Sequence, residues 1–305
     1  MAATDSASTL SARSVRRGRS PLAGISPSSR WYWLRTLLEN PVALVSAVII
    51  LGLVLVALLA PVLAPQDPTF IDPVVRLQGP SERYRLGTDD AGRDVLSRVI
   101  YGARVSLLIG VTVTAAVACI GSVLGLLSGY YDRLDTPIMR VMDGLLAFPT
   151  ILLAIAIMAS LGPSTLNVFI ALTVTYTPSV ARLVRGSTLS LRGQPYVESA
   201  RAIGARDHVI LRRYIFANAL SPLIVQCTFV VAFAIILEAS LSFLGAGVNP
   251  ETPTWGNMLR DGQRVLQRAW WLSVFPGCAL VITVLTLNLL GDGLRDALDP
   301  RARRR

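Results

Sequence analysis

The sequence predicts an all-α membrane protein with six transmembrane helices, and three observations lead to this fold class. Hydrophobic residues make up 52% of the 305-residue chain, and the mean hydropathy of +0.55 is too high for a soluble domain with a wet surface. None of the apolar runs shows the short alternating pattern of a membrane β-barrel, so helices must satisfy the backbone polar groups of each span. The six apolar runs lie at about 42–63, 105–130, 138–161, 166–184, 217–242 and 272–291.

The first apolar run follows a polar leader. Residues 1–38 are rich in Ser, Ala, Gly, Pro and Arg without apolar periodicity, so we expect a disordered, Arg-rich cytoplasmic tail. Asn40 and Pro41 suit the N-cap and the first position of a helix. The run of about 22 apolar residues that follows is too long for the h-region of a signal peptide, so we expect an uncleaved anchor. Residues 39–305 are therefore predicted to form one transmembrane domain.

The orientation follows from the distribution of arginines. Each run holds about 20 residues or more, which crosses a hydrocarbon core of about 30 Å at a rise of about 1.5 Å per residue. All 29 basic residues are arginines, and roughly 20 of them fall on one side if the N-terminus is cytoplasmic. This predicts two cytoplasmic termini, outer loops at about 64–104 and 243–271, and a cytoplasmic loop at about 185–216. Basic residues spread along one membrane face favour a lipid bilayer over a nucleic acid as the partner.

Several kinds of chemistry are excluded by what the chain lacks. It has no lysine, so it cannot hold a GxxxxGK[ST] P-loop and cannot hydrolyse ATP by that route. A single histidine, His208, and three scattered cysteines provide neither an HExxH nor a CxxC site. We therefore expect a protein that is not an enzyme, with no catalytic residue, no metal and no cofactor bound by this chain.

The cytoplasmic loop carries the strongest local signal. Seven arginines fall between Arg182 and Arg213, and each would cost about 2.5–3.5 kcal/mol at the bilayer centre, so the loop must lie outside the lipid. Pro195 is a favoured first-turn residue, and helix formers follow it up to Ile203. Gly204 suits a left-handed turn, and Asp207 suits the cap of a second helix. The pattern predicts a short helix, a sharp turn and a second helix.

This loop offers a surface for a partner protein. Four of its residues are predicted to share an apolar face suited to a partner's groove: Tyr196, Val197, Ala200 and Ile203. Three others offer charge pairs: Glu198, Arg201 and Arg206.

The same residues resemble a known motif. Glu198-Ser199-Ala200, with Gly204 six residues after the glutamate, and NALSPLIV from Asn218 resemble the EAA motif of ABC importer permeases. Ser199 stands where alanine gives the motif its name, and Ser221 stands where proline is frequent. The resemblance implies a type I ABC importer permease fold. It also implies that the helix from Tyr196 to Gly204 inserts into a cleft of a separate ATP-binding subunit and passes on its closure.

Four further segments narrow the resemblance. They are similar to the C-type integral subunit of dipeptide and oligopeptide importers: RLGTDDAGRDVLSRVIYGARVSL from Arg85, LLAFPTILLAIAI from Leu145, LEASLSFLGAGVNPETPTWGNML from Leu237 and LNLLGDGLRDALDPR from Leu287. This likeness implies a heterodimer with a B-type permease subunit, two ATP-binding subunits that hold ATP and magnesium, and an extracytoplasmic solute-binding protein. It places the chain in the bacterial inner membrane as a peptide permease that works by alternating access.

Other functions stay open at this point. Members of the same family carry nickel or other small solutes, so the resemblance leaves nickel or another small solute as an alternative cargo. A membrane scaffold or sensor is a different class of function, but neither the tail nor the cytoplasmic loop is long enough to fold into a signalling domain. An exporter permease is disfavoured because the motif belongs to importers.

Residues inside the predicted spans suggest further roles. Prolines, an acid and an amide are candidates for the translocation path: Pro149, Pro178, Glu238 and Asn288. For Glu238 the alternative is pairing with an arginine of the outer loop. Three glycines at four-residue spacing predict close helix packing: Gly121, Gly125 and Gly129.

The outer loops give weaker signals. Three tryptophans are expected to anchor the membrane boundary: Trp255, Trp270 and Trp271. The segment from Asp67 to Arg98 mixes acids with arginines, and it either contributes to the face that receives the binding protein or is a plain solvated loop. Its GTDDAGRD stretch lacks the order and the terminal glutamate of an EF-hand, so we do not expect a calcium site.

Overall fold

The computed structural model describes residues 39–298, which form helices and no strand. The predicted tail, 1–38, lies outside these residues. The α-helices are α2 (Pro41–Leu58), α3 (Ala60–Leu63), α4 (Val95–Tyr130), α5 (Asp132–Leu146), α6 (Thr150–Leu161), α7 (Thr165–Arg192), α8 (Pro195–Ala202), α9 (Asp207–Val209), α10 (Ala217–Phe243), α11 (Trp255–Arg264) and α12 (Trp271–Leu298). A 3₁₀ turn, η1 (Pro73–Val75), and a π-helical segment, η2 (Ile210–Phe216), complete them. The all-α prediction is confirmed.

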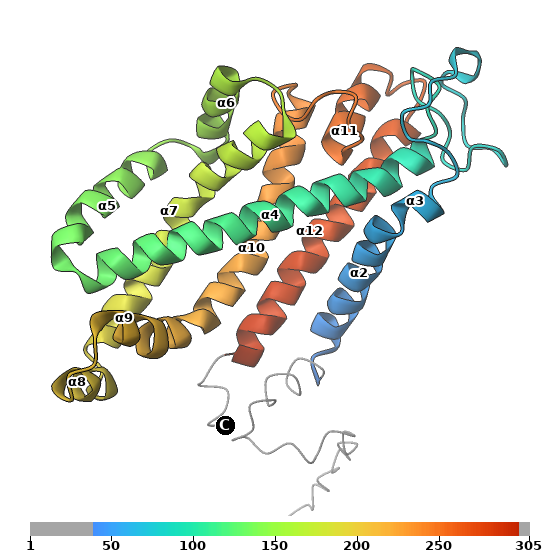
Figure 1. Ribbon diagram of the computed structural model, residues 1–305. Helices are drawn as coiled ribbons and strands as arrows, with labels where there is room; N and C mark the ends of the chain where they lie inside the picture. The colour runs from blue at the N-terminus through green and yellow to red at the C-terminus, as the bar shows by residue number, and fades with distance from the viewer. Residues whose placement is uncertain (1–38, 299–305) are drawn as a thin grey trace, which may run out of the picture.

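The long helices lie side by side and give the bundle two ends (Figure 1). One end, called the α11 end, holds the segment 64–94, α11 and the beginnings of α4 and α12. The other, called the α8 end, holds α8, α9 and the ends of α4 and α7. Helix α2 begins and α12 ends at the α8 end.

The membrane spans agree with the sequence only in part. Four helical segments are long and apolar enough to cross a bilayer: α2, α4, the continuous helix from Asp207 to Phe243, and α12. The bent pair of α5 and α6 makes a fifth if it counts as one span. Helix α7 has the length but not the hydropathy, because arginines occupy its second half. The chain is thus a multi-pass membrane protein with four or five such spans by length and composition.

The apolar run at 138–161 was predicted to be one span, and the structure divides it between two helices. Helices α5 and α6 meet at a bend of 92°. Pro149 has no amide hydrogen to continue the helix, and it stands at the N-cap of α6. Helix α5 is amphipathic: Met139 and Met142 are buried near Ala181 of α7, and its three aspartates form ion pairs with arginines of α7 at the edge of this contact.

The predicted start of α2 is confirmed. The Asn40 side chain accepts hydrogen bonds from the amides of Val42 and Ala43 at 3.1 and 3.2 Å, and Pro41 occupies the first helical position. Its missing amide hydrogen costs nothing there, because the first amides of a helix have no partner within the helix.

Helices α4 and α7 make the most extensive contact between two helices. Gly121, Gly125 and Gly129 lie in this contact. A Cβ atom at Gly125 would lie 2.5 Å from the carbonyl oxygen of Ala181, and one at Gly129 would lie 2.6 Å from Cβ of Thr188. Only glycine permits this approach, so the two backbones are held close together from Gly121 to Gly129.

Candidate functional site

The loop after α7 forms a short helix, a turn and a second helix, as predicted. Pro195 begins α8, and Gly204 follows the helix with φ of +80°. A Cβ atom at Gly204 would meet no heavy atom within 4 Å, so the backbone conformation and not the lack of space calls for glycine. From Asp207 the helix runs without interruption through η2 into α10.

The apolar residues of α8 that were expected to meet a partner are partly buried in the bundle and partly exposed to solvent. Val197 and Ala200 are buried, and Val197 packs with Ile210 and Ile215 of η2. The prediction that all four apolar residues face outward is therefore wrong for these two, because the same stripe that suits a partner's groove also holds α8 on the bundle. Tyr196 is 40% exposed, and Ile203 is 82% exposed.

The charged residues of α8 also divide. Glu198 of α8 and Arg206, which follows the turn, are both exposed. Arg201 instead turns toward the bundle, where its guanidinium carbon lies 5.7 Å from the centre of the Tyr130 ring and its Nη2 lies 3.5 Å from the Tyr130 hydroxyl. Tyr196 and the C-cap residue Ile203 are exposed on one side of α8, and the Glu198 carboxylate is exposed on another.

Asp207 connects this surface to the rest of the bundle. The Tyr130 hydroxyl donates to its carboxylate at 2.7 Å, and the Tyr131 hydroxyl donates to the other oxygen at 3.2 Å. Tyr130 ends α4, and Tyr131 is the N-cap residue of α5. The expectation that Asp207 caps the second helix is wrong, since Arg206 holds the N-cap position. One carboxylate therefore joins the start of the second helix to the junction of α4 and α5.

Three ion pairs tie α5 to α7 beside this junction. Arg185 donates two hydrogen bonds to the carboxylate of Asp135, from Nε at 2.5 Å and from Nη2 at 2.6 Å. The other two pairs are Arg192 with Asp132 at 2.7 Å and Arg182 with Asp143 at 2.6 Å. All three are open to solvent to some degree, so each adds little stability, but together they fix the orientation of α5 along α7.

Comparison with known proteins identifies the family. Residues 121–304 match the family described as binding-protein-dependent transport system inner membrane component. The chain belongs to this family of permeases. Residues 29–80 also match the N-terminal transmembrane domain of oligopeptide transport permease C.

Relatives match most of this permease. A putative peptide transport system permease protein of Brucella abortus is 48% identical over 88% of this chain and 90% of its own length. The dipeptide transport system permease protein of Alkalihalophilus pseudofirmus is 44% identical over 88% of each chain. The glutathione transport system permease protein of Pectobacterium atrosepticum is 44% identical over 89% of this chain and 91% of its own.

Glu238 of the permease lies in the contact between helices α10 and α4. It is fully buried and accepts hydrogen bonds from Ser242 at 2.9 Å and Ser106 at 3.3 Å, which joins α10 to α4. Within residues 39–298 no arginine forms an ion pair with it, so the expected pairing with an outer-loop arginine is wrong. Hydroxyl donors satisfy this carboxyl group where no cation reaches it.

The other three path candidates do not come together. Pro149 is exposed at the bend between α5 and α6, whereas Pro178 is buried in α7, which continues past it. Asn288 of α12 is half-buried and forms no hydrogen bond within the described part of the chain. These positions lie on three different helices and share no cavity.

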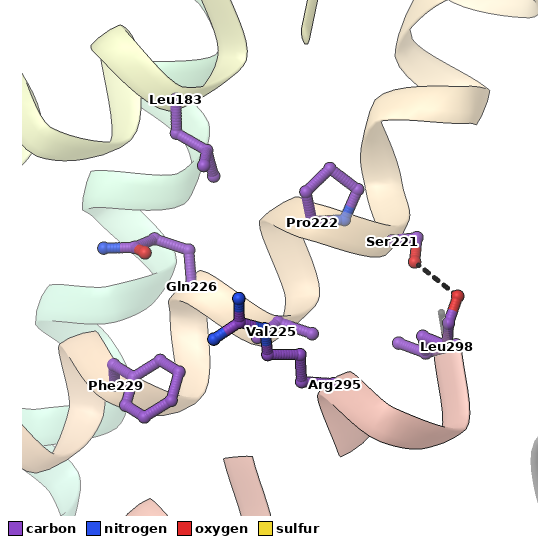
Figure 2. Close-up of a pocket in the computed structure, with 8 residues that line it drawn as sticks. All are labelled: Leu183, Ser221, Pro222, Val225, Gln226, Phe229, Arg295 and Leu298. Atoms are coloured by element: carbon purple, nitrogen blue, oxygen red, sulfur yellow. Dashed lines mark hydrogen bonds between the residues drawn. The ribbon is translucent and has the colours of Figure 1, made fainter. Parts of the chain in front are cut away.

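A cavity of about 450 Å³ opens instead between α7, α10 and α12, toward the α8 end (Figure 2). Its polar side chains are Gln226, Arg295 and Ser221, whose hydroxyl donates to the carbonyl of Leu298 at 3.4 Å, and Arg295 reaches from α12 toward α10. Sequence analysis missed Gln226 and Arg295. Gln226 is a polar residue within the apolar run at 217–242, and this interruption could have marked it as a site residue. Arg295 was used only in the count of arginines that predicted the membrane orientation. The remaining lining residues are Leu183, Pro222, Val225, Phe229 and Leu298.

The α11 end is held by buried charges. Asp89 accepts from the amides of Ala91 and Arg93 at 2.9 Å each, and from Nε of Arg93 at 2.6 Å. Nε of Arg98 lies 3.6 Å from the same carboxylate, and its Nη1 donates to the carbonyl of Pro68 at 3.2 Å. Burial and the nearby Asp90 raise the pKa of Asp261, while the two arginines oppose this shift.

Two of the three expected membrane anchors belong to this cross-linked end. Trp255 is buried and donates to the carbonyl of Val99, and Trp271 donates to the carbonyl of Thr88, both at 3.1 Å. The anchor prediction is therefore wrong for these two, because Trp255 packs in the core among α2, α4 and α10, and Trp271 packs under the segment 64–94. Trp270 is about half exposed.

Proposed function

We propose that this permease is the C-type subunit of an ABC importer that moves dipeptides or oligopeptides across the bacterial inner membrane by alternating access. The relatives support the cargo, since their names specify peptide, dipeptide and glutathione transport, and glutathione is itself a tripeptide. The partners are a B-type permease subunit, two ATP-binding subunits that hold ATP and magnesium, and an extracytoplasmic solute-binding protein. This chain supplies the membrane path.

The observation that carries the proposal is the arrangement of α8. One face is buried on η2, while Tyr196, Glu198 and Ile203 face away from the bundle. A helix held on one side that leaves large apolar side chains exposed suits insertion into a groove of a partner protein. These three residues form the docking surface for the ATP-binding subunit.

Movement of α8 passes to the bundle through its polar contacts. Arg201 on α8 and Asp207 at the start of the second helix both contact Tyr130. Closure of the ATP-binding subunits pushes α8, and the tyrosines carry the displacement to α4 and α5. Gly204 is the point where α8 turns relative to the second helix, because it is the connection with a left-handed conformation.

The proposed orientation has six crossings, with both termini and the α8 end in the cytoplasm. Helix α7 is the crossing that hydropathy alone does not identify. Its buried face contains Val168, Leu172 and Val180 together with threonines whose hydroxyls donate to the preceding turn of the same helix. A helix packed against its neighbours in this way needs less hydropathy than one surrounded by lipid. The proposal treats α5 and α6 as one broken crossing.

Copurification tests the docking surface. The tagged chain is isolated in mild detergent from its native host, and the copurified ATP-binding subunits are quantified by mass spectrometry. Ile203→Glu is expected to reduce their recovery at least tenfold, since it places a charge in the docking groove without disturbing a buried side chain. Val74→Glu is the matched control, because Val74 is 87% exposed at the opposite end. Equal recovery with both variants would refute the docking role.

Uptake of a labelled dipeptide by cells that lack the chain tests the cargo. Restored uptake on complementation with the wild type supports peptide transport. Restored uptake of nickel alone, with normal recovery of the ATP-binding subunits, would overturn the cargo and leave the docking surface in place.

A further inference from the structure

A groove on the side of the bundle, near the α8 end, joins an apolar wall to basic side chains. It lies between the last turns of α4 and the helix that runs from α9 through η2 into α10, and its volume is about 480 Å³. Cys119, Val123 and Phe216 contribute to the wall. His208 and Arg212 also line it, and both are exposed. None of these residues belongs to the docking surface of α8.

The basic residues of the groove have no acidic partner in the described chain. His208 and Arg212 are four residues apart on the helix, and neither forms an ion pair within residues 39–298. The neighbouring acid, Asp207, directs its carboxylate to the two tyrosines of the α4–α5 junction. Arg212 therefore presents a positive charge that is free to meet an anion, and His208 adds a ring nitrogen that can donate a hydrogen bond beside it.

A hydroxyl in the wall is the second observation. The side-chain oxygen of Ser122 is buried and forms no hydrogen bond with any residue that the structure describes. Most buried hydroxyls have a partner, and many in helices donate to the preceding turn. Ser122 stands one turn from Leu126 and one turn from Ala118, and all three line the groove.

The order of these groups along α4 indicates the ligand. His208 lies beside the end of α4, because the adjacent Asp207 is bonded to Tyr130. Moving from there toward the membrane centre, the groove presents the guanidinium of Arg212, then the Ser122 hydroxyl, then the small, weakly polar side chains of Ala118 and Cys119. A phospholipid carries phosphate, ester and acyl chain in the same order.

We propose that this groove binds an anionic phospholipid of the inner leaflet. Its phosphate lies at Arg212 and His208, an ester carbonyl accepts from Ser122, and one acyl chain follows α4. Basic pockets between helices on the cytoplasmic side are suited to such headgroups. The inference rests on the proposed orientation, which places the α8 end in the cytoplasm. A lipid here also contacts the start of the second helix, shortly after the Gly204 turn. Its binding therefore affects how freely α8 moves relative to that helix.

Native mass spectrometry of the purified, delipidated transporter assembly tests the site. Phosphatidylglycerol and phosphatidylcholine with the same acyl chains are the probes. Arg212→Gln is expected to weaken phosphatidylglycerol binding about fivefold, the effect of one basic residue, and to leave phosphatidylcholine binding unchanged. Arg213→Gln is the matched control, since Arg213 is also exposed on η2 but does not line the groove. Cys119→Trp fills the groove and is expected to reduce binding of both lipids.

Two results would overturn the inference. Equal losses of phosphatidylglycerol with Arg212→Gln and Arg213→Gln would mean a general attraction between the loop and anionic lipids. Efficient crosslinking of Cys119 to another subunit would mean that the groove is a protein interface. Recovery of the ATP-binding subunits is measured for each variant, and normal recovery separates a failure of the lipid site from a failure of the proposed docking.

Discussion

The two ends of the bundle use charged residues in opposite ways. At the α11 end, Arg98 is 1% exposed and shares the buried carboxylate of Asp89 with Arg93. At the α8 end, the ion pairs between α5 and α7 are open to solvent. Buried pairs resist separation because each partner would be left charged and unpaired, whereas exposed pairs exchange with water at little cost.

This difference matches the demands of the proposed transport cycle. The α11 end keeps one shape, with the segment 64–94 tied to α4 by Arg98 and to α12 by Trp271. The α8 end holds its outermost helix on the bundle by one small apolar contact, of Val197 with Ile210 and Ile215, by the turn at Gly204 and by a few polar contacts. An element meant to move needs few buried contacts and a connection that allows rotation. The comparison therefore predicts stability defects at one end and coupling defects at the other.

The largest effect is expected at Arg98. Arg98→Met removes the buried cation and leaves Asp89 with Arg93 alone, which is expected to lower the free energy of unfolding by about 3 kcal/mol. The measurement is the midpoint of thermal unfolding in detergent. Arg182→Met is the control, since that exposed pair with Asp143 is expected to contribute at most about 1 kcal/mol. Similar shifts for both variants would remove the distinction between the two ends.

The contact between α4 and α7 should behave as one rigid unit linking the ends. Gly125→Ala forces a methyl group against the Ala181 carbonyl and is expected to cost about 1–3 kcal/mol. Gly186→Ala on α7 is the matched control, because its Cβ would meet nothing within 4 Å and alanine favours a helix. Both are compared by thermal unfolding, and a tolerated Gly125→Ala would mean that the two helices separate easily.

The sequence predicted what depends on neighbouring residues. Asn40 and Pro41 begin α2, and Gly204 forms the turn, because a cap or a left-handed residue acts within a few positions. The predicted run at 138–161 begins inside α5, so it left out the charged first turn of that helix, which includes Asp135. Counting hydropathy over 138–161 concealed an amphipathic helix followed by a break at Pro149.

What the sequence did not predict depends on contacts between distant residues. Val197 is buried because η2 folds back on α8, and Asp207 meets tyrosines 76 and 77 residues earlier. Trp255 looked like a membrane anchor, yet it donates to Val99, 156 residues away. Residue type and spacing are the same in either arrangement, so only the packed chain decides between them.

A smaller effect is expected at Gly204. Valine at a left-handed position is strained by about 1–2 kcal/mol, and the chain relieves this by changing the turn that sets the direction of α8. ATP-driven dipeptide uptake is expected to fall about tenfold while the midpoint of unfolding stays unchanged. Gly204→Asn is the control, because asparagine tolerates this conformation. If both variants transport equally well, the turn does not control coupling.

The smallest effect concerns a single hydroxyl at the α8 end. Tyr130→Phe removes one donor to Asp207 and is expected to weaken the link by about 1 kcal/mol, a few-fold loss of uptake. Asp207→Asn and the double variant complete a cycle of uptake measurements. If the two side chains act through their shared hydrogen bond, the double variant loses less than the two single losses combined, because the second change finds the bond already broken. Losses that simply combine would mean that α8 reaches α4 by another route, of which the contact of Arg201 with the Tyr130 ring is the next to test.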